Sequence, residues 1–451
     1  MAVLTHVRHT PQPLPLSLAA FLTMIVRVRS PEHRHWPHLR GRRRLLGRPR
    51  PRVHHRLGLS RSSRLRCPRQ GKPLLLNAPP LTSRYSHSQD IINKYYASTD
   101  GIQYSYWSGC STGGRQGLKE IQTHPDSFDG LAIGAPTWWI THISAGQLRR
   151  GLLNLPESDV KHIAPELFPV ITKEMESQCD PQDGLSDGII SDPLGCDFDF
   201  EALLCKGSNS SDCLVEEQLD TLKKVYTDWH EDDTLVWSGS TLGTPPSVLQ
   251  NASWAIGLDF FRYFVQNDSS WELTEFTYAD LQLADDINPG DAIAGDFDLS
   301  AFKERGGKVL LYHGEADDAI PPGDSIYFRE QVQETLGDNI DDFYRVFLIP
   351  GMGHCASSTL APWYVGGAGH AFALGSTQPV PELKDPEHDV MLAVTQWVEE
   401  NKAPEKLIAT KFANDTLEGG VMGQRPVCVY PRKARYLEGE DPDEARSWEC
   451  E

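Results

Sequence analysis

The 451-residue sequence lacks any run of about eighteen consecutive apolar residues, so we predict no membrane-spanning segment. Acids are nearly absent from the first 84 positions, where 18 Lys and Arg stand against the single acid Glu32. Positive charge is scarce in the remainder, where 61 acids outnumber 25 bases. An acidic body repels nucleic acid and anionic membrane surfaces, so we expect neither as a partner.

Sustained periodicity is also missing from residues 1–84, which are rich in Arg, Pro, His and Ser. One interpretation is a disordered basic arm, which would bind nucleic acid in a salt-sensitive way. We favour a faulty gene prediction or a degraded N-terminus, because an acidic, cysteine-bearing body seldom carries such an arm. Residues 14–26 resemble the apolar part of a signal peptide, but Arg27 follows them where a small-residue cleavage site belongs.

From residue 91 onward, patterns typical of buried strands alternate with patterns typical of helices. Strands are predicted at 103–107, 131–136, 308–314 and 344–349. A helix is predicted through Leu118 and Ile121, and Asp385-Pro386 is predicted to cap another that contains Val390 and Val394. This alternation predicts an α/β fold with a doubly wound sheet.

A long segment rich in Cys, Asp, Gly and aromatic residues interrupts this alternation, and we interpret it as a lid domain inserted above the sheet. The predicted organisation is a low-order segment at 1–84, an α/β domain in two parts at 85–137 and 299–451, and the lid at 138–298.

The segment Gly109-Cys110-Ser111-Thr112-Gly113 fits the G-x-S-x-G pattern between a predicted strand and a predicted helix. So sharp a turn requires small flanking residues and leaves the Ser111 hydroxyl exposed at the end of the strand. The helix N-terminus then faces a developing oxyanion, with the amide of Thr112 as one donor. Ser111 is therefore a candidate nucleophile; the alternative is a glycine-rich turn whose hydroxyl has no chemical role.

A serine nucleophile needs a histidine base and a carboxylate to orient it, in the chain order Ser, acid, His for this fold. Asp317 follows the predicted strand at 308–314 and is our choice of acid, with Asp318 and Glu315 as alternatives. His354 follows the next strand and is the predicted base. Three other histidines lack such a placement and are expected to have surface or core roles: His124, His142 and His370.

Nine cysteines and four Asn-x-Ser/Thr sequons, at Asn209, Asn251, Asn267 and Asn414, favour the secretory route. A bridge between Cys110 and Cys355 would tie the predicted nucleophile to the predicted base, and would contribute about 5 kcal/mol on the chain-entropy model. Two buried free thiols are the alternative. Connectivity does not follow from sequence alone; proximity suggests the pairs Cys179–Cys196, Cys205–Cys213 and Cys428–Cys450, which leaves Cys67 over.

An acidic loop at 180–190 carries three carboxylates, Asp180, Asp183 and Asp187, together with two glycines. Converging hard oxygen ligands with flexible geometry suit Ca²⁺, and the carbonyls of Leu185 and Ile189 are candidates to complete the shell. The loop is no EF-hand, because the twelve-residue spacing and the closing Glu are absent. The alternative is a solvated acidic turn.

From about residue 91 to the C-terminus, the sequence resembles the tannase/feruloyl esterase family of secreted fungal and bacterial hydrolases. The motifs that carry the resemblance are at 109–117, 128–130, 134–136, 180–190 and 353–355. The resemblance implies an α/β-hydrolase fold and a bridge between Cys110 and Cys355. It also implies a structural calcium in the lid, with ligands at Asp180, Asp183, Leu185, Asp187 and Ile189. The lid would supply most of the substrate pocket, with Trp138–Trp139 either near a phenolic ring or packed in the core.

The function implied is a secreted serine esterase that acts through Ser111, Asp317 and His354 on galloyl, feruloyl or other hydroxycinnamoyl esters. Aromatic diester fragments of synthetic polymers are a related substrate class. Residues 1–84 depart from the family, whose members carry early strands and a Gly-rich loop there, so part of the sheet is expected to be missing. A truncated, inactive secreted relative that retains calcium and disulfides is therefore the alternative. The sequence does not indicate an oligomeric state.

Overall fold

A computed structural model describes residues 22–28, 94–95, 102–207, 212–337, 340–356, 363–374, 376 and 383–451. The chain divides into two compact units, one formed by residues 1–27 and 104–451 and the other by residues 28–103. The elements described below belong to the first unit, apart from the end of β1 and the start of β2. Asn209 and Cys67 lie outside the described residues.

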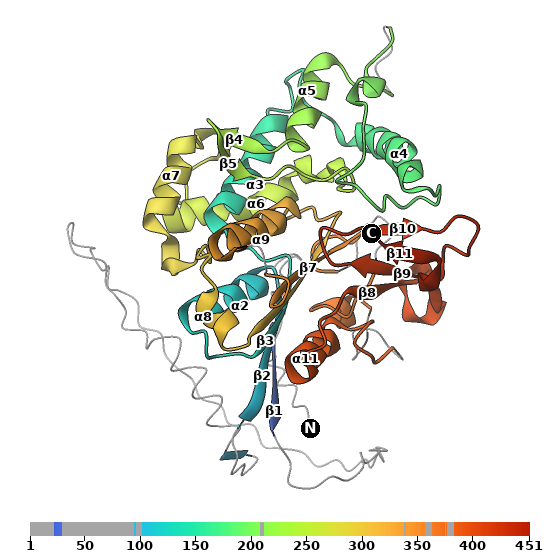
Figure 1. The fold of residues 1–451 in the computed structure, drawn as a ribbon. Helices are drawn as coiled ribbons and strands as arrows, with labels where there is room; N and C mark the ends of the chain where they lie inside the picture. The colour runs from blue at the N-terminus through green and yellow to red at the C-terminus, as the bar shows by residue number, and fades with distance from the viewer. Residues whose placement is uncertain are drawn as a thin grey trace, which may run out of the picture. The chain divides into compact units, whose positions relative to one another are not determined.

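A five-stranded sheet forms the centre of this unit (Figure 1). Strands β2, β3, β6 and β7 pair in parallel, each in register with the next. The strand order is β1 (Leu22–Val28), β2 (Ile102–Cys110), β3 (Gly130–Gly134), β6 (Lys308–Gly314) and β7 (Tyr344–Ile349). All four strands predicted from the sequence are thus confirmed. Their near-continuous apolar runs suit strands that are covered on both faces.

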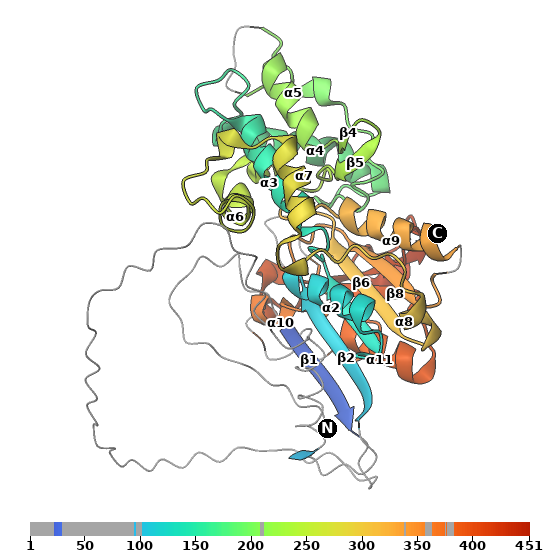
Figure 2. The ribbon, with the colours of Figure 1, turned by 90° about the vertical axis from the view of Figure 1, so that its left-hand side faces the viewer.

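Helices cover the two faces of the sheet, with α2 (Thr112–Thr123) on one and α11 (Val390–Glu400) on the other (Figure 1, Figure 2). Close packing explains two of the glycines. A Cβ at Gly117 would lie 2.6 Å from the Trp107 ring, and one at Gly130 would lie 2.9 Å from Val398 of α11. The predicted α/β fold with a parallel sheet is confirmed.

The start of α11 corrects one prediction. Its N-cap is Asp389, whose side chain accepts hydrogen bonds from the amides of Met391 and Leu392 at 2.8 and 3.1 Å. Asp385 instead bonds the amides of Glu387 and His388 in the preceding turn. The predicted cap at Asp385-Pro386 is therefore wrong, because both aspartates can close a turn and the nearer one caps the helix.

The segment 138–298 gathers above the sheet in Figure 1, and it contains one apolar cluster of its own and most of a second, which also includes Ile320. Its main elements are α3 (Ile140–Asn154), α4 (Phe168–Cys179), α5 (Glu216–Val225), β4 (Trp229–Glu231), β5 (Thr234–Trp237), α6 (Asn251–Phe260) and α7 (Tyr278–Ile287). Its short helices are η2 (Pro165–Leu167), η3 (Asp180–Asp183), η4 (Phe200–Leu203), η5 (Pro246–Leu249), η6 (Phe261–Val265), η7 (Leu273–Glu275) and η8 (Pro289–Asp291). The segment shares one compact unit with the sheet, so the division at 138 and 298 stays a prediction.

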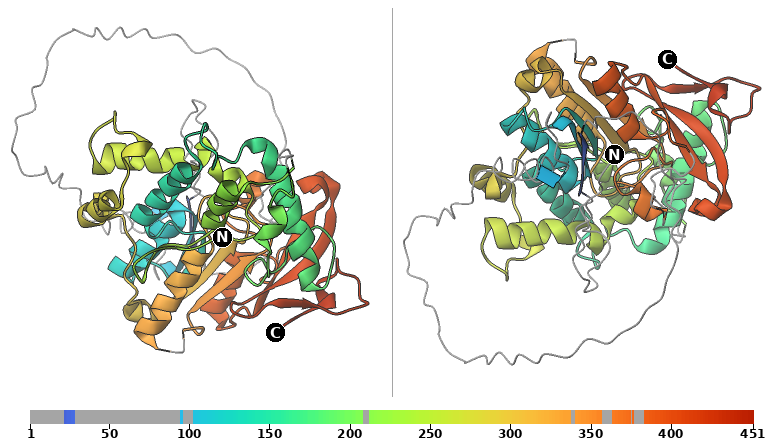
Figure 3. Two further views of the ribbon diagram at one scale, coloured as in Figure 1. Left: turned by 90° about the horizontal axis from the view of Figure 1, so that it is seen from above. Right: turned by 90° about the horizontal axis from the view of Figure 1, so that it is seen from below.

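The last part of the chain adds two small antiparallel sheets beside β7 (Figure 1, Figure 3). One joins β8 (Lys406–Phe412) to β9 (Val421–Cys428), and the other joins β10 (Ala434–Tyr436) to β11 (Trp448–Cys450). A bridge between Phe347 and Val429 connects them to β7. The remaining helices are α8 (Ser300–Glu304), α9 (Gly323–Leu336), α10 (His370–Ala373), η9 (Ala413–Asp415), η10 (Leu417–Gly419) and η11 (Ala445–Ser447).

Strand β1 corrects a second expectation. We predicted a low-order segment at 1–84 from its lack of sustained periodicity, yet residues 22–28 form a strand next to β2. The segment contains Thr23, Ile25, Val26 and Val28, and β-branched residues favour strands even when the flanking sequence shows no period. The other residues of 1–84 lie outside the described part of the chain.

Candidate active site

Ser111 lies at the junction between β2 and α2 in a strained backbone conformation, with φ of 60° and ψ of −121°. Its N–H donates to the carbonyl of Gly134 at 2.9 Å, and its own carbonyl accepts from Arg115 at 3.0 Å and Thr137 at 3.2 Å. The turn is therefore fixed by both the helix that follows it and the end of β3. This geometry presents a serine at the tip of a strand-to-helix turn.

Two glycines make this turn sterically feasible. A Cβ at Gly109 would lie 2.7 Å from the backbone of Gly113, and one at Gly114 would lie 2.8 Å from the carbonyl oxygen of Gly134. Thr112 is the first residue of α2, so its amide belongs to the first turn, whose N–H groups have no partner within the helix. That amide is available for the oxyanion role predicted from the sequence.

Asp317 and His354 meet at the ends of β6 and β7. His354 Nδ1 lies 2.9 Å from Asp317 Oδ2, and the carboxylate is fully buried while the imidazole is 23% exposed. The other oxygen, Oδ1, accepts the amides of Ala319 and Ile320, both at 2.9 Å. Because the carboxylate engages Nδ1, the opposite nitrogen, Nε2, is the one placed to act as a base.

Each member of this pair shifts the pKa of the other. Burial alone would raise the pKa of Asp317, but the charge of His354 and hydrogen bonds from His313 and His354 outweigh it and hold that pKa far below its usual range. Burial alone would lower the pKa of His354, but the Asp317 carboxylate outweighs it and raises that pKa above its usual value. The structure thus places a carboxylate that stays ionised beside an imidazole whose basicity is increased.

A disulfide joins the two halves of the site. Cys110 and Cys355 are bridged with their Cα atoms 5.8 Å apart, and they are the immediate neighbours of Ser111 and His354. Consecutive Cα atoms are only about 3.8 Å apart, so the bridge holds the serine turn and the histidine loop at the same end of the sheet. The alternative of two free thiols is wrong. The other predicted pairs are confirmed: Cys179–Cys196, Cys205–Cys213 and Cys428–Cys450.

The two alternative acids occupy other places. Asp318 has an exposed side chain, and its carbonyl accepts a hydrogen bond from the buried Arg150 of α3 at 2.8 Å. Burial lowers the pKa of Arg150 to about 10, which leaves the guanidinium charged at neutral pH. Glu315 lines a separate cavity described below. Only Asp317 of these three hydrogen-bonds His354 among the described residues.

Sequence reasoning missed two residues near this site. His313, at the end of β6, is fully buried and its Nε2 lies 3.2 Å from Asp317 Oδ2. Arg150 comes from α3, far away in the sequence, and also bonds Ser240 Oγ at 2.8 Å. The available signal for His313 was its position at the end of a strand, four residues before the acid. No sequence signal indicated Arg150.

The three histidines to which we assigned surface or core roles lie outside the pair. His370 is fully buried and accepts the amide of Gly367 at 3.1 Å, and burial lowers its pKa to about 4. His142 contacts the carbonyl of Val236 and the carboxylate of Asp285 within 138–298. His124 follows α2 and lies 3.0 Å from the Thr123 hydroxyl.

The two tryptophans named in the sequence analysis differ in environment. Trp138 is 2% exposed, donates from Nε1 to the carbonyl of Asp324 at 3.0 Å, and packs against Phe328. Trp139 is partly exposed and stacks on His142 with ring centroids 3.4 Å apart. Trp138 is therefore part of the core.

The acidic loop folds into a closed turn, with φ of 97° at Gly184 and 78° at Gly188. Its carboxylates accept main-chain amides, as when Asp180 accepts Gly188 at 3.1 Å and Asp183 accepts Leu185 at 2.9 Å. Asp187 also pairs with the Arg425 guanidinium of β9.

The loop has ligand atoms of the type that a metal needs, but its side chains are not arranged as they would be around a metal. Its carboxylate and carbonyl oxygens are the ligands that Ca²⁺ prefers. Burial raises the pKa of Asp183, and the neighbouring Asp187 carboxylate adds to the shift. Among the described residues, however, no three acid, histidine or cysteine side chains gather as a metal would require. The calcium ligands Asp180, Asp183, Leu185, Asp187 and Ile189 stay a prediction.

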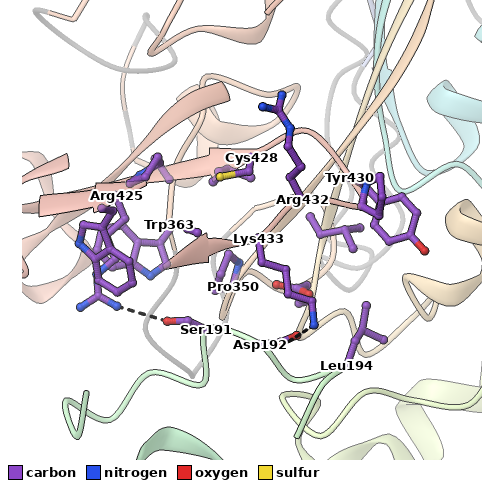
Figure 4. Close-up of a pocket in the computed structure, with 18 residues that line it drawn as sticks. Ser191, Asp192, Leu194, Pro350, Trp363, Arg425, Cys428, Tyr430, Arg432 and Lys433 are labelled. Atoms are coloured by element: carbon purple, nitrogen blue, oxygen red, sulfur yellow. Dashed lines mark hydrogen bonds and ion pairs between the residues drawn. The ribbon is translucent and has the colours of Figure 1, made fainter. Parts of the chain in front are cut away.

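A cavity of about 70 Å³ lies between residues 191–194, Glu315 and the C-terminal strands (Figure 4). Lys433 and Asp192 form an ion pair at 2.5 Å across it. Glu315 is 5% exposed, and burial, with the nearby Asp192 charge, raises its pKa to about 8. Neither Ser111 nor His354 lines this cavity, so it is distinct from the candidate active site.

The fold and the site together define a class. A parallel sheet covered by helices, with a strained serine turn after one strand and a bonded acid–histidine pair after two others, is the architecture of α/β-hydrolases. The chain belongs to the tannase and feruloyl esterase family, whose model matches residues 81–248 and 277–451. The resemblance noted in the sequence is thereby confirmed.

Individual relatives agree with this assignment. The chain is 35% identical over 360 residues to a probable feruloyl esterase B-2 of Aspergillus terreus and 34% identical to one of Aspergillus oryzae, in each case over 78% of this chain. It spans 66% of the length of those relatives.

Solved structures are similar as well. A crystal structure of feruloyl esterase B from Aspergillus oryzae superimposes with a TM-score of 0.73 at 31% identity, covering 82% of this chain and 74% of that one. A tannin acyl hydrolase from Aspergillus niger gives a TM-score of 0.60 at 21% identity, over 80% of this chain and 66% of that one, and supports the fold alone.

Proposed function

We propose that this chain is a serine carboxylic ester hydrolase that cleaves esters of phenolic acids, of the feruloyl or other hydroxycinnamoyl type or of the galloyl type. The observation that carries the proposal is the bonded pair of His354 and Asp317, tied by the Cys110–Cys355 bridge to the strained turn at Ser111. The relatives named feruloyl esterase indicate the substrate class.

The first half-reaction forms an acyl-enzyme. His354 Nε2 takes the proton of the Ser111 hydroxyl as the oxygen attacks the ester carbonyl. Asp317 stabilises the imidazolium that results, through the 2.9 Å contact at Nδ1. The Thr112 amide and the N-terminus of α2 stabilise the oxyanion. The alcohol then leaves with the proton that His354 returns.

The second half-reaction releases the phenolic acid. His354 takes a proton from water, the resulting nucleophile attacks the acyl carbonyl, and the bond to Ser111 Oγ breaks as His354 returns the proton to it. Because the pKa of Asp317 is held far below its usual range, Asp317 stays ionised while His354 passes protons between Ser111, the leaving alcohol and water.

The proposal includes secretion. Four disulfides among the described residues suit an oxidising compartment. Asn267 and Asn414 are exposed and available as glycan sites. Within the described part of the chain, no helix has the length and apolar character that crossing a bilayer requires. The partner is then a phenolic ester from plant cell walls or tannins.

The proposal also includes a structural Ca²⁺ at the 180–190 loop. Asp180, Asp183 and Asp187 would hold it through carboxylate oxygens, and Leu185 and Ile189 through carbonyls. Its supports are the hard oxygen donors and the buried Asp180 carboxylate.

Hydrolysis of methyl ferulate and methyl gallate by the purified chain tests the proposed activity. We expect release of one or both acids and a loss of at least about 10³-fold in kcat for Ser111→Ala. Ser177→Ala, which truncates an exposed serine on α4, serves as the matched control and should keep full activity. Folded protein that releases neither acid would contradict the proposal and favour a truncated, inactive relative.

A further inference from the structure

His313 makes three polar contacts in a fully buried environment at the end of β6. Its Nε2 lies 3.0 Å from the carbonyl oxygen of Ile320 and 3.2 Å from Asp317 Oδ2. Its Nδ1 lies 2.8 Å from the hydroxyl of Ser325 in α9, which is also fully buried. No water competes for these groups, so each contact must match a donor with an acceptor.

The contacts assign the proton on this ring. A carbonyl oxygen only accepts hydrogen bonds, so Nε2 of His313 carries the hydrogen that points toward Ile320 and Asp317. When Nδ1 carries no hydrogen, the Ser325 hydroxyl donates to it, and the ring is then the Nε2–H tautomer.

Asp317 is consequently surrounded by donors on both oxygens. Its Oδ1 accepts two main-chain amides, and its Oδ2 lies 2.9 Å from His354 Nδ1 and 3.2 Å from His313 Nε2. His313 and His354 therefore contact the same carboxylate oxygen of Asp317.

We propose that His313 is a positioning residue for the reaction. As the Nε2–H tautomer, it donates to Oδ2 of Asp317 and thereby fixes the orientation and the basicity of the carboxylate that pairs with His354. The inference rests on the proposed function, because the pair acts only if Ser111 is the nucleophile.

Other charged groups also face this cluster, so their influence on the pKa of His354 has to be considered. Asp318 lies beside Asp317 and His354, Arg150 approaches from α3, and Asp324 approaches His313 from α9. All of them remain when His313 is replaced. Without the His313 donor, the Asp317 charge acts on His354 with less compensation, so the pKa of His354 rises.

Two substitutions separate positioning from simple packing. His313→Phe keeps the ring volume but removes both nitrogens, whereas His313→Gln keeps an N–H donor on a side chain that reaches about as far as Nε2. We expect His313→Phe to lower kcat by about 10- to 100-fold with little change in KM, because a misplaced catalytic group has effects of this size. The acidic limb of the kcat/KM profile should move up by about 0.5 pH unit. His313→Gln should keep most of the wild-type kcat and nearly the wild-type position of the acidic limb.

Equal losses in the two variants with an unchanged acidic limb would overturn the proposal, because that result is expected of a packing role. If His313→Phe does not fold, Ser325→Ala provides the same test with a smaller volume change. It removes the hydroxyl that favours one tautomer of His313. We expect a smaller fall in kcat than in His313→Phe and a shift of the acidic limb in the same direction. No shift in folded Ser325→Ala would contradict the proposal.

A measurement without turnover distinguishes failure of this inference from failure of the proposed function. In ¹⁵N-histidine-labelled Ser111→Ala protein, NMR should show a signal of a buried neutral imidazole protonated at Nε2 that is absent from Ser111→Ala/His313→Gln. His370, whose Nδ1 accepts the amide of Gly367, should give a second signal of this kind that persists in both proteins. The imidazole of His354 should titrate at a higher pH in Ser111→Ala/His313→Phe. An Nδ1–H tautomer for His313 would overturn the inference even if the wild-type enzyme hydrolyses esters. If the protein shows the expected tautomer but has no activity, the contact of His313 with Asp317 stands and the proposed esterase function is rejected.

Discussion

At the scale of single residues, surroundings decide which of three neighbouring acids serves the base. Glu315, Asp317 and Asp318 follow the same strand, but only the second receives hydrogen bonds on both oxygens and meets His354. The order Ser, acid, His and the position after a strand were enough to favour Asp317. The sequence could not rank the three by environment, because the amides, the imidazole and the cavity that surround them come from separate parts of the chain.

Glu315 gives a stability prediction at this scale. Burial raises its pKa from the ordinary 4.5 to about 8, so between these values the folded protein keeps a proton that the unfolded chain releases. Stability contributed by this group is therefore greatest below pH 4.5 and is lost progressively up to about pH 8. We expect Glu315→Gln to raise the Tm relative to wild type at pH 8 and to leave it nearly unchanged at pH 4.5.

Thermal unfolding at pH 4.5, 6 and 8 measures this effect. Glu418→Gln, at an exposed site on η10, is the matched control and should follow wild type at each pH. A Glu315→Gln difference that does not depend on pH would mean that Glu315 is already ionised in the folded protein.

At the scale of elements, the strands were predictable and some of their partners were not. Buried parallel strands are marked by apolar runs, which is why β3, β6 and β7 were found from sequence, whereas β2 was found from its strand-favouring aromatic residues. β1 was missed because its β-branched residues stand within an Arg- and Pro-rich segment. The acidic loop was found as a turn, whereas its contact with Arg425 of β9 was not, since 238 residues separate Arg425 from Asp187.

The acidic loop carries a prediction on metal removal. A metal that binds the folded loop and not the unfolded chain stabilises by mass action, by about 2.7 kcal/mol at a hundredfold excess over Kd. We expect chelation with EGTA to lower the Tm by several degrees and Ca²⁺, but not Mg²⁺, to restore it. Differential scanning calorimetry measures both steps.

Variants locate the metal. Asp183→Asn should remove most of the response to Ca²⁺, whereas Asp233→Asn, at an exposed site in the turn between β4 and β5, should respond like wild type. Metal-free protein whose Tm does not change with added Ca²⁺ would leave the loop as a solvated acidic turn.

At the scale of the whole molecule, one covalent bond joins residues that are 245 positions apart. The Cys110–Cys355 bridge restricts the unfolded chain and joins the turn that carries Ser111 to the loop that carries His354. On the chain-entropy model such a bridge contributes about 5 kcal/mol, against about 2.5 kcal/mol for a loop of eight residues.

The double variant Cys110→Ala/Cys355→Ala tests that bond. We expect a lower free energy of unfolding and a large loss of kcat under conditions where the protein remains folded. Cys205→Ala/Cys213→Ala removes the eight-residue loop and should lose less stability and little activity. Urea unfolding and ester hydrolysis give the two quantities, and equal losses of activity in both variants would show that the long bridge does not organise the site.

The sequence by itself predicted four strands of the sheet, the serine turn, the choice of Asp317 and His354 as candidates, and, from proximity alone, three disulfides between cysteines close along the chain. These features are encoded locally, in apolar runs, glycine positions and short spacings. Only the tertiary structure decided what surrounds the candidate site: His313 and Ser325 around Asp317, Arg150 on the carbonyl of Asp318, and Arg425 on Asp187. The contacts of Arg150 and Arg425 join residues that are distant in sequence. A buried polar side chain finds its partner only when packing has removed water from both.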